Sequence, residues 1–391
     1  MANAPENEYF EKISAGLGIL QVVLYLSLFA FVVVSFFANT ELITYRNFYY
    51  FFKDLNASAE TVDVFSSDSV TYPSSAEQSF TLYRKGLAVA GNESVTVFTA
   101  TGRQTVSYNI QYQNPIAVGT GKYLLVYEQG GVSFSLYNSY TQIFSGKSEY
   151  PIYGAAVSES GMYALISRSE QYTSVVSLYN SDFILINRYN RNGYVTDVAI
   201  NSKGTRVALL SSVSDMGGIS TTLTLYEPKK TEAIATARIG DSVGLSCAFA
   251  DGGNVSVLCK NRMVVVGSSG EVGSSYGFDG RSILAADLGR DGATVVLRPT
   301  PISQKSDVLV FDRNGKTICR KTIDESGLEV DRVGNSVYLL SRSGILFIDA
   351  ASGKTRFYDC VTERRSVLAV SAGEVLLCSA QKAEYIRFSN D

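Results

Sequence analysis

Residues 198–211 read VAINSKGTRVALLS, and this stretch decides the fold. Two apolar runs, VAI and VALL, flank a polar Asn-Ser-Lys-Gly-Thr segment. β-Branched and aliphatic residues suit a buried strand, and Gly204 supplies the positive φ that a tight turn requires. The stretch therefore predicts an antiparallel hairpin of two buried strands.

The same order of strand, glycine turn and strand recurs along the chain. The eight turn glycines are Gly86, Gly121, Gly161, Gly204, Gly253, Gly292, Gly334 and Gly373. Successive glycines are 35, 40, 43, 49, 39, 42 and 39 residues apart. A period of about 40 residues is typical of the four-stranded blades of a β-propeller.

A second hairpin follows the first in most units. Examples are SVTVFTATGRQTVSYNI from Ser94 and DVLVFDRNGKTICRKTI from Asp307. The turn Asn314-Gly315 has the residues that tight hairpins prefer. Each unit is thus predicted to contain four antiparallel strands, named a to d from the channel outward.

The last unit offers three strands, SVLAV, EVLLCS and AEYIRF, whereas Thr61–Tyr72 (TVDVFSSDSVTY) resembles a strand ahead of the first unit. Because open sheet edges are a liability, we expect this N-terminal strand to complete the last blade and close the ring. The predicted fold is all-β: an eight-bladed β-propeller over residues 61–391, with seven blades as the fallback. A row of separate sandwiches would explain neither the period nor the missing strand.

The stretch GYVTDVAINSKGTRVALLSS, Gly193–Ser212, resembles the V-x-x-V-a-h-S-x-D-G-x-x-h-A segment of WD40-like and bacterial YVTN-type propellers. The Gly-His and Trp-Asp signatures of true WD40 repeats are absent, because the chain has no His and no Trp. The whole layout also resembles an uncharacterised family of membrane-anchored propeller proteins of Gram-positive anaerobes. That resemblance implies a domain outside the cytoplasmic membrane and no known activity.

A long apolar segment precedes the repeats. Residues 13–40 contain no charged residue, and Leu17–Phe37 is long enough to cross a bilayer as a helix. A cleavable signal peptide is the alternative, but the first 12 residues hold three glutamates against one lysine, and the apolar core is long. We therefore predict a short tail at residues 1–12 and an uncleaved transmembrane signal anchor at residues 13–40.

An aromatic linker, residues 41–60, follows the predicted span. Its rings are suited to the lipid headgroup layer, either as a simple collar or as a docking surface for a partner in the membrane. The predicted interfacial residues are Tyr45, Phe48, Tyr49, Phe51 and Phe52. Lys12 before the span and Arg46 and Lys53 after it leave the orientation undecided by charge.

The composition excludes several classes of function. Without His there is no Ser-His-Asp or Cys-His catalysis and no His metal site. The five cysteines show no CxxC spacing, and the net charge of −3 does not suit a general nucleic-acid binder. We predict no cofactor, no metal and no nucleic-acid partner, and we expect the cysteines to be small buried residues, although Cys247 and Cys259 flank one predicted hairpin and could pair.

Carboxylates remain the possible catalytic groups. The stretch DESGLEVD, with Asp324, Glu325, Glu329 and Asp331, has no calcium-loop pattern and predicts a solvated connection. Asp197 lies on a predicted inner strand, where hydrogen bonding between blades is its expected role.

Loops on a rigid scaffold are the usual binding elements. The two longest predicted b–c loops are Ser211–Thr221 and Arg298–Asp307, and the d–a connection Arg188–Tyr194 lies on the same face. That connection combines Arg and Tyr, which are enriched in binding hot spots. The predicted partner-binding surface is Tyr189, Arg191, Tyr194, Met216, Pro299 and Ile302.

These observations favour a non-catalytic scaffold or sensor at the cell envelope that binds a protein or an envelope polymer. One alternative is a glycan hydrolase or lyase with Asp197, Asp287 and Asp331 at the channel mouth. Another is a structural subunit of a membrane complex, held through the aromatic linker.

Overall fold

The computed structural model describes residues 17–31, 68–138, 141–215, 217–360 and 364–388. The chain divides into two units, Met1–Thr61 and Val62–Asp391. In the first unit, residues 17–31 form a helix. Within the described part of the chain, no helix is both long and apolar enough to cross a membrane. The predicted interfacial residues at positions 45–52 lie outside the described residues.

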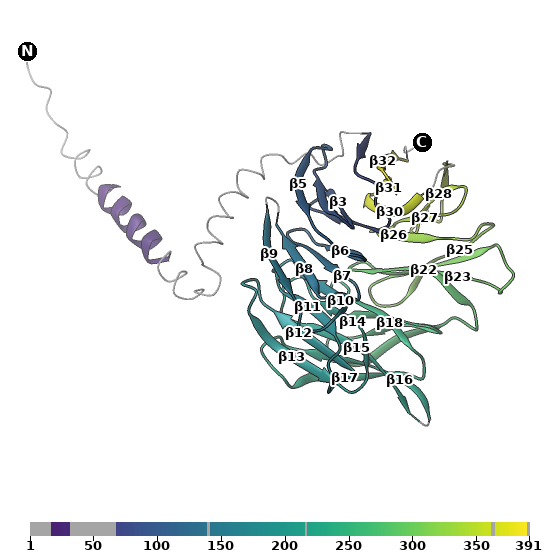
Figure 1. Ribbon diagram of the computed structural model, residues 1–391, viewed down its shortest axis with the longest axis horizontal. Coiled ribbons are helices and arrows are strands. Elements are labelled where there is room, and N and C mark those ends of the chain that lie inside the picture. The colour runs from purple at the N-terminus through teal and green to yellow at the C-terminus, as the bar shows by residue number, and fades with distance from the viewer. Residues whose placement is uncertain (1–16, 32–67, 139–140, 216, 361–363, 389–391) are drawn as a thin grey trace, which may run out of the picture. The chain divides into compact units, whose positions relative to one another are not determined.

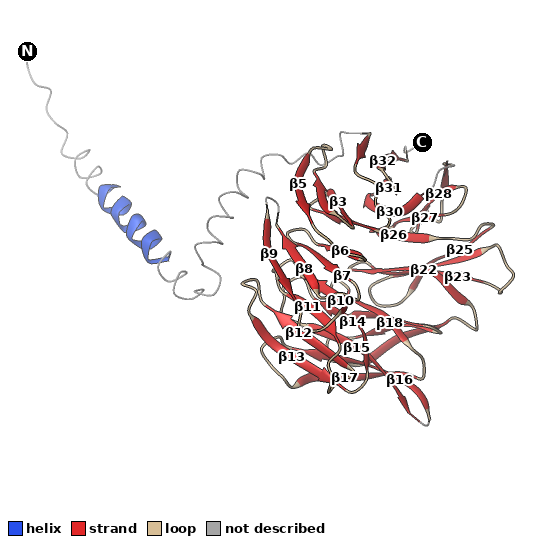
Figure 2. Cartoon of the chain, in the orientation of Figure 1, coloured by secondary structure: helices blue, strands red, loops and turns tan. Residues whose placement is uncertain are grey.

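The second unit consists of eight four-stranded antiparallel sheets, as predicted (Figures 1 and 2). Blade 1 contains β2 (Gln78–Tyr83), β3 (Gly86–Gly91), β4 (Ser94–Phe98) and β5 (Gln104–Asn109); blade 2 contains β6 (Pro115–Gly119), β7 (Leu124–Glu128), β8 (Ser133–Tyr137) and β9 (Gln142–Lys147). Blade 3 contains β10 (Ile152–Val157), β11 (Tyr163–Ser167), β12 (Ser174–Tyr179) and β13 (Leu185–Arg191); blade 4 contains β14 (Tyr194–Ile200), β15 (Val207–Asp215), β16 (Gly218–Tyr226) and β17 (Ala233–Gly240). Blade 5 contains β18 (Gly244–Phe249), β19 (Val255–Cys259), β20 (Arg262–Val266) and β21 (Val272–Gly277); blade 6 contains β22 (Ser282–Gly289), β23 (Gly292–Arg298), β24 (Ser306–Phe311) and β25 (Thr317–Ile323). Blade 7 contains β26 (Glu329–Val333), β27 (Ser336–Leu340), β28 (Gly344–Asp349) and β29 (Thr355–Asp359); blade 8 contains β30 (Arg364–Ser371), β31 (Glu374–Ser379), β32 (Lys382–Arg387) and β1 (Ser69–Thr71).

The first strand of each blade faces the central channel, and these inner strands contact one another in ring order, including β30 with β2. We call the end of the channel where the inner strands begin the upper end, and the end where they turn into the second strands the lower end. The middle strands are mostly buried, as in β11 and β23, whereas the outer strand β25 alternates between half-buried and exposed residues. This pattern follows from stacking sheets face to face, because neighbouring blades cover both faces of the middle strands, whereas the outer strands meet solvent.

The apolar core is divided among the interfaces between blades. Eight clusters of buried side chains each combine residues from two neighbouring blades, one cluster for every interface of the ring. No sheet therefore buries its apolar faces alone, and the ring is the unit that folds.

The predicted closure by the N-terminal strand is confirmed. β1 pairs antiparallel with β32, with Val70 opposite Ala383. The core between blades 8 and 1 contains Val70 and Tyr72 together with Leu87 and Leu376. The structure thus has eight blades rather than the seven of the fallback.

Six of the eight predicted turn glycines have positive φ, but Gly86 and Gly121 do not. In the turn between β2 and β3 of blade 1, Arg84 and Lys85 are the left-handed residues, with φ of 48° and 60°. Gly86 is needed for a different reason: a Cβ there would lie 2.0 Å from the carbonyl oxygen of Phe98.

Two segments that the sequence analysis predicts to be loops are mainly strand. Ser211–Thr221 is mostly the long hairpin of β15 and β16, paired as far as Asp215 opposite Gly218 (Figure 1). Its Ser, Thr and Val residues favour strands, and the two central residues are enough for the turn. The connection Arg188–Tyr194 is likewise strand, except for Asn192 and Gly193.

Candidate functional site

The residues of the predicted binding surface differ in accessibility. Tyr189, on β13, is buried, and its ring packs against Tyr226 with 4.3 Å between centroids. Arg191 is half-buried and lies over the same Tyr226 ring. Tyr189 therefore belongs to the core between blades 3 and 4, and Arg191 contacts a ring of that core. Of the three predicted residues in this segment, only Tyr194 is largely exposed.

The remaining predicted residues belong to other parts of the ring. Pro299 and Ile302 lie between β23 and β24 of blade 6, and Ile302 is 91% exposed. Blade 5 separates them from Tyr194 on blade 4. Met216 lies outside the described residues.

A different group of side chains gathers around Tyr194 at the upper end. Arg168, in the connection between β11 and β12, has its guanidinium carbon 5.0 Å from the centroid of the Tyr153 ring and 5.4 Å from that of Tyr194. Tyr153 is near the start of β10 and Tyr194 begins β14, so two blades contribute. Two cation–π contacts hold this arginine between exposed rings.

Val213 extends the group along blade 4. A Cβ at Gly193 would lie only 2.5 Å from a methyl carbon of Val213, so the valine lies directly over the backbone beside Tyr194. Gly193 is therefore required here for close approach.

Leu245 extends the group to blade 5. Ser212, which is opposite Tyr194 in the sheet, accepts a hydrogen bond from the Gly244 N–H at 3.2 Å. Leu245 follows Gly244 at the start of β18, so it lies at the upper end of blade 5, beside blade 4. We call the five side chains the upper-face patch: Tyr153, Arg168, Tyr194, Val213 and Leu245.

The inner-strand carboxylates have structural partners. Asp197 accepts hydrogen bonds from the N–H groups of Val198 and Cys247, both at 2.8 Å, and Cys247 belongs to the next blade. The predicted role between blades is thus confirmed. Burial raises the pKa of Asp197 to about 6, against the opposing effect of these two bonds.

The interpretation of DESGLEVD as a solvated loop is wrong for its second half. Glu329 and Asp331 are on inner strand β26 and bind blade 8: Glu329 accepts from the Val367 N–H, and Asp331 from the Ala369 N–H at 2.7 Å. Burial raises the pKa of Glu329 to about 7 and also raises that of Asp331. Polar and apolar residues mix in the sequence E-V-D-R-V as they do in a half-buried strand. This pattern was the signal in the sequence that could have identified an inner strand here.

The three aspartates do not converge on one cavity. Asp287 and Asp331 line a cavity of about 420 Å³ at the lower end, and Asp197 lines a neighbouring one of about 1150 Å³. Asp197 and Asp331 already accept two backbone N–H groups each, so their geometry fits connections between blades rather than paired acid–base catalysis. Among the described residues, no group of three His, Cys, Asp or Glu is placed to hold a metal ion.

The five cysteines form no disulfide with one another, so Cys247 and Cys259 do not pair, and four of the five are buried. Burial raises the pKa of Cys259 to about 11, which disfavours the reactive thiolate. They serve as small apolar residues of the strands.

Solved structures share this fold. Sqt1 of Saccharomyces cerevisiae is 10% identical and matches with a TM-score of 0.61 over 82% of this chain and 98% of that chain. Sqt1 of Chaetomium thermophilum, bound to the N-terminus of the ribosomal protein L10, is 11% identical, with a TM-score of 0.59 over 83% and 100%. The C-terminal WD40 domain of Sif2 is 10% identical, with a TM-score of 0.58 over 82% and 97%. The similarity to WD40 propellers is thereby confirmed for the fold.

No curated protein sequence matches the chain significantly. A family model described as a family of unknown function, DUF5711, matches residues 59–388. This match includes the whole described propeller. The chain therefore belongs to the DUF5711 family.

Proposed function

We propose that this chain is a non-catalytic interaction module, anchored in the cell membrane, whose propeller binds a protein partner at the upper end of the channel. The upper-face patch carries the proposal. Tyr153, Tyr194, Val213 and Leu245 are 44%, 54%, 45% and 43% exposed, although each is a large apolar or aromatic side chain. Aromatic residues and Arg on a rigid scaffold are the composition of binding hot spots. One propeller of similar fold, Sqt1 of Chaetomium thermophilum, was solved bound to the N-terminus of the ribosomal protein L10, which agrees with a protein-binding role for this fold.

The arginine specifies the partner further. Arg168 lies between two rings, so its orientation is set before a partner arrives and little side-chain entropy is lost on binding. A stacked guanidinium still presents N–H donors at its edge, and these match a carboxylate. We infer a partner segment that places an Asp or Glu beside apolar side chains.

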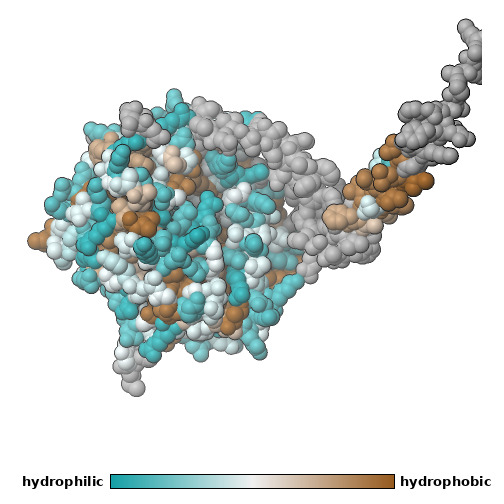
Figure 3. Space-filling model, turned by 180° about the vertical axis from the view of Figure 1, so that it is seen from behind, coloured by the Kyte–Doolittle hydropathy of each residue, from teal (hydrophilic) through white to brown (hydrophobic). Residues whose placement is uncertain are grey.

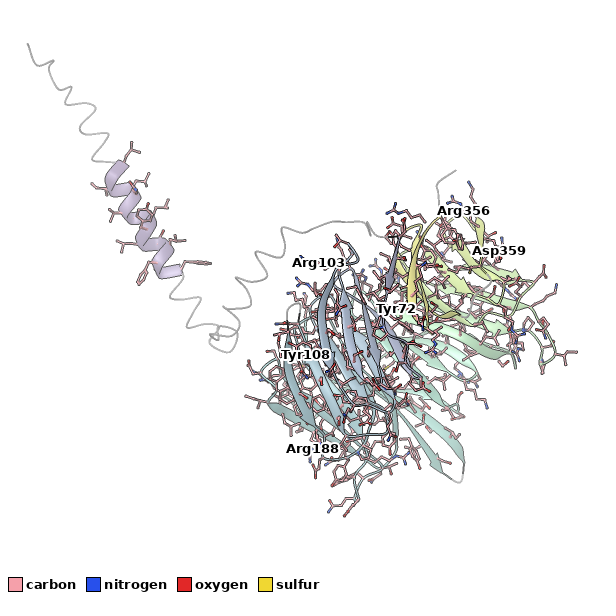
Figure 4. All side chains as sticks on the ribbon, turned by 45° about the horizontal axis from the view of Figure 1, so that its top comes forward. Tyr72, Arg103, Tyr108, Arg188, Arg356 and Asp359 are labelled. Atoms are coloured by element: carbon pink, nitrogen blue, oxygen red, sulfur yellow. The ribbon has the colours of Figure 1, made fainter. Side chains whose placement is uncertain are left out.

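Photo-crosslinking in cells of the source organism tests the patch. With a benzophenone amino acid in place of Val213 in the full-length chain, we expect one dominant adduct. Arg168→Glu should reduce this adduct about tenfold, since it reverses the charge that faces the partner's carboxylate. Arg103→Glu, in the turn between β4 and β5 (Figure 4), is the matched control and should leave the adduct unchanged. If Arg168→Glu and Arg103→Glu reduced the amount of adduct equally, the patch would have no specific role in binding the partner.

Membrane anchoring rests on the N-terminal segment. The described helix at residues 17–31 exposes large apolar side chains around its circumference, among them Leu20, Leu24 and Phe31. Figure 3 shows hydrophobic residues over most of this helix, whereas they are scattered among hydrophilic ones on the visible face of the propeller. Such a helix needs an apolar environment, and the uncharged sequence at residues 13–40 would give it the length of a span.

Cell fractionation and protease treatment test the anchor and its orientation together. We expect the full-length chain to stay in the membrane pellet after alkaline carbonate washing, and a chain without residues 1–40 to become soluble. We also expect added protease to digest the propeller in intact cells, because we propose an extracytoplasmic location. Digestion only after lysis would place the propeller in the cytosol and contradict that orientation.

A further inference from the structure

The two cavities at the lower end of the channel share part of their lining. The larger lies against blades 2 to 6, and the smaller is lined by blades 1, 2, 6, 7 and 8. Their shared residues include Gly121 and Arg290. At about 420 Å³ the smaller cavity has the size of a small-molecule site.

Four cationic side chains line this smaller cavity. Arg84 and Lys85 come from the turn between β2 and β3, Arg290 from the turn between β22 and β23, and Arg332 from β26. The side chain of Arg332 is fixed, because it donates to the carbonyl oxygens of Gly334 and Phe311, both at 2.7 Å. Three blades, 1, 6 and 7, thus contribute cationic residues to the lining of one cavity.

Three carboxylates, Asp287, Asp291 and Asp331, line the same cavity, one fewer than the cationic residues. Asp331 accepts the N–H groups of Arg332 and Ala369, and Asp291 accepts the Gly334 N–H at 2.9 Å. Asp287 is buried beside Asp331, and burial followed by the charge of Asp331 raises its pKa to about 8. Protonation of Asp287 increases the excess of positive charge that the four cationic and three acidic lining residues give the cavity.

The turn that carries two of the cations is strained. Arg84 and Lys85 both occupy the left-handed region, where Asn and Gly are the preferred residues of such a hairpin. A side chain at these positions adds backbone energy that glycine would avoid. Strain of this kind is found where side chains have a role beyond the local fold.

We propose that the smaller cavity binds a compact polyanion that carries two or more phosphate or carboxylate groups. An arginine guanidinium such as that of Arg290 matches either anion through paired N–H donors, and Lys85 adds a point charge. Arg332 contributes its charge, because its Nε and Nη1 already donate to backbone carbonyl oxygens. The site lies at the opposite end of the channel from the upper-face patch, so it is independent of the partner site proposed above.

Calorimetric titration of the purified full-length chain tests this site, with pyrophosphate and citrate as separate probes at low ionic strength. We expect saturable binding of one molecule per chain. Arg290→Ala should weaken it about tenfold, the usual effect of one charge-assisted contact. Lys85→Gly should weaken it similarly while raising or preserving Tm, because glycine adopts φ near 60° without strain.

Lys122→Ala is the matched control. Lys122 is exposed at the same end of the channel, in the turn between β6 and β7, and does not line the cavity. Binding of only pyrophosphate or only citrate would support the proposal and identify the preferred anionic group as phosphate or carboxylate. Binding of both would support a site that accepts either group. The proposal is overturned if neither probe binds, or if Lys122→Ala costs as much affinity as Arg290→Ala.

Discussion

Replacing Tyr72 with alanine should lower the free energy of unfolding of the propeller by about 4 kcal/mol, the usual cost of removing a large buried aromatic side chain. Tyr72 follows the closing strand β1 and is buried (Figure 4). Its ring lies 5.8 Å from that of Phe80 and 6.3 Å from that of Phe98, both in blade 1. Its hydroxyl donates to the Ser379 carbonyl oxygen in blade 8 at 2.8 Å. One side chain thus joins the two ends of the ring.

Urea unfolding followed by circular dichroism measures the effect. Tyr72→Phe keeps the ring and loses the bond to Ser379, so it should cost only about 1 kcal/mol. Tyr358→Ala removes an equally large but exposed ring from outer strand β29 and should leave the stability unchanged. If Tyr72→Ala were as stable as Tyr358→Ala, the closure by β1 would not contribute to the stability of the ring.

The repeat architecture could be predicted because it depends on patterns within short segments of the sequence. Each hairpin has its own strand residues and its own turn, as at Gly204 and Gly315, and a regular period follows from stacking identical units. The closing strand could also be predicted, because an incomplete last unit leaves an edge that another strand has to cover. The long hairpin of blade 4 was mistaken for a loop, since Ser, Thr and Gly residues are common to both.

The upper-face patch could not be predicted, because its residues are distant in the sequence. Tyr153 and Arg168 come from blade 3, Tyr194 and Val213 from blade 4, and Leu245 from blade 5, so they share one end of the channel only after the ring has closed. Composition alone pointed to Tyr189 and Tyr194 equally, yet one is buried and the other exposed. Which face of a strand meets solvent depends on its position in the blade, and the short segment around these tyrosines does not contain that information.

Replacing Asp331 with alanine should lower the free energy of unfolding by about 3 kcal/mol at pH 6. The carboxylate accepts the N–H groups of Arg332 at 2.8 Å and of Ala369 at 2.7 Å, and the second bond joins blade 7 to blade 8. Alanine would leave both donors without a partner in a mostly buried wall, and each such donor costs about 1–3 kcal/mol. Asp331→Asn keeps one acceptor and should lose about half as much. Glu232→Ala, at an exposed turn, is the control and should leave stability unchanged.

The pH dependence distinguishes the lost bonds from the lost charge. Burial and the charge of Asp331 raise the pKa of Asp287 to about 8, above the value near 4 that an unfolded chain shows. A raised folded-state pKa gives stability that is fully present below about pH 4 and is lost as the pH rises to 8. Without Asp331 the pKa of Asp287 should fall, so the variant loses less stability over this range than the wild type. We therefore expect the deficit of Asp331→Ala, measured by urea unfolding, to narrow between pH 6 and pH 8. A deficit that widened with pH would mean that Asp331 acts chiefly as a counter-ion of Arg332 rather than as an acceptor that joins two blades.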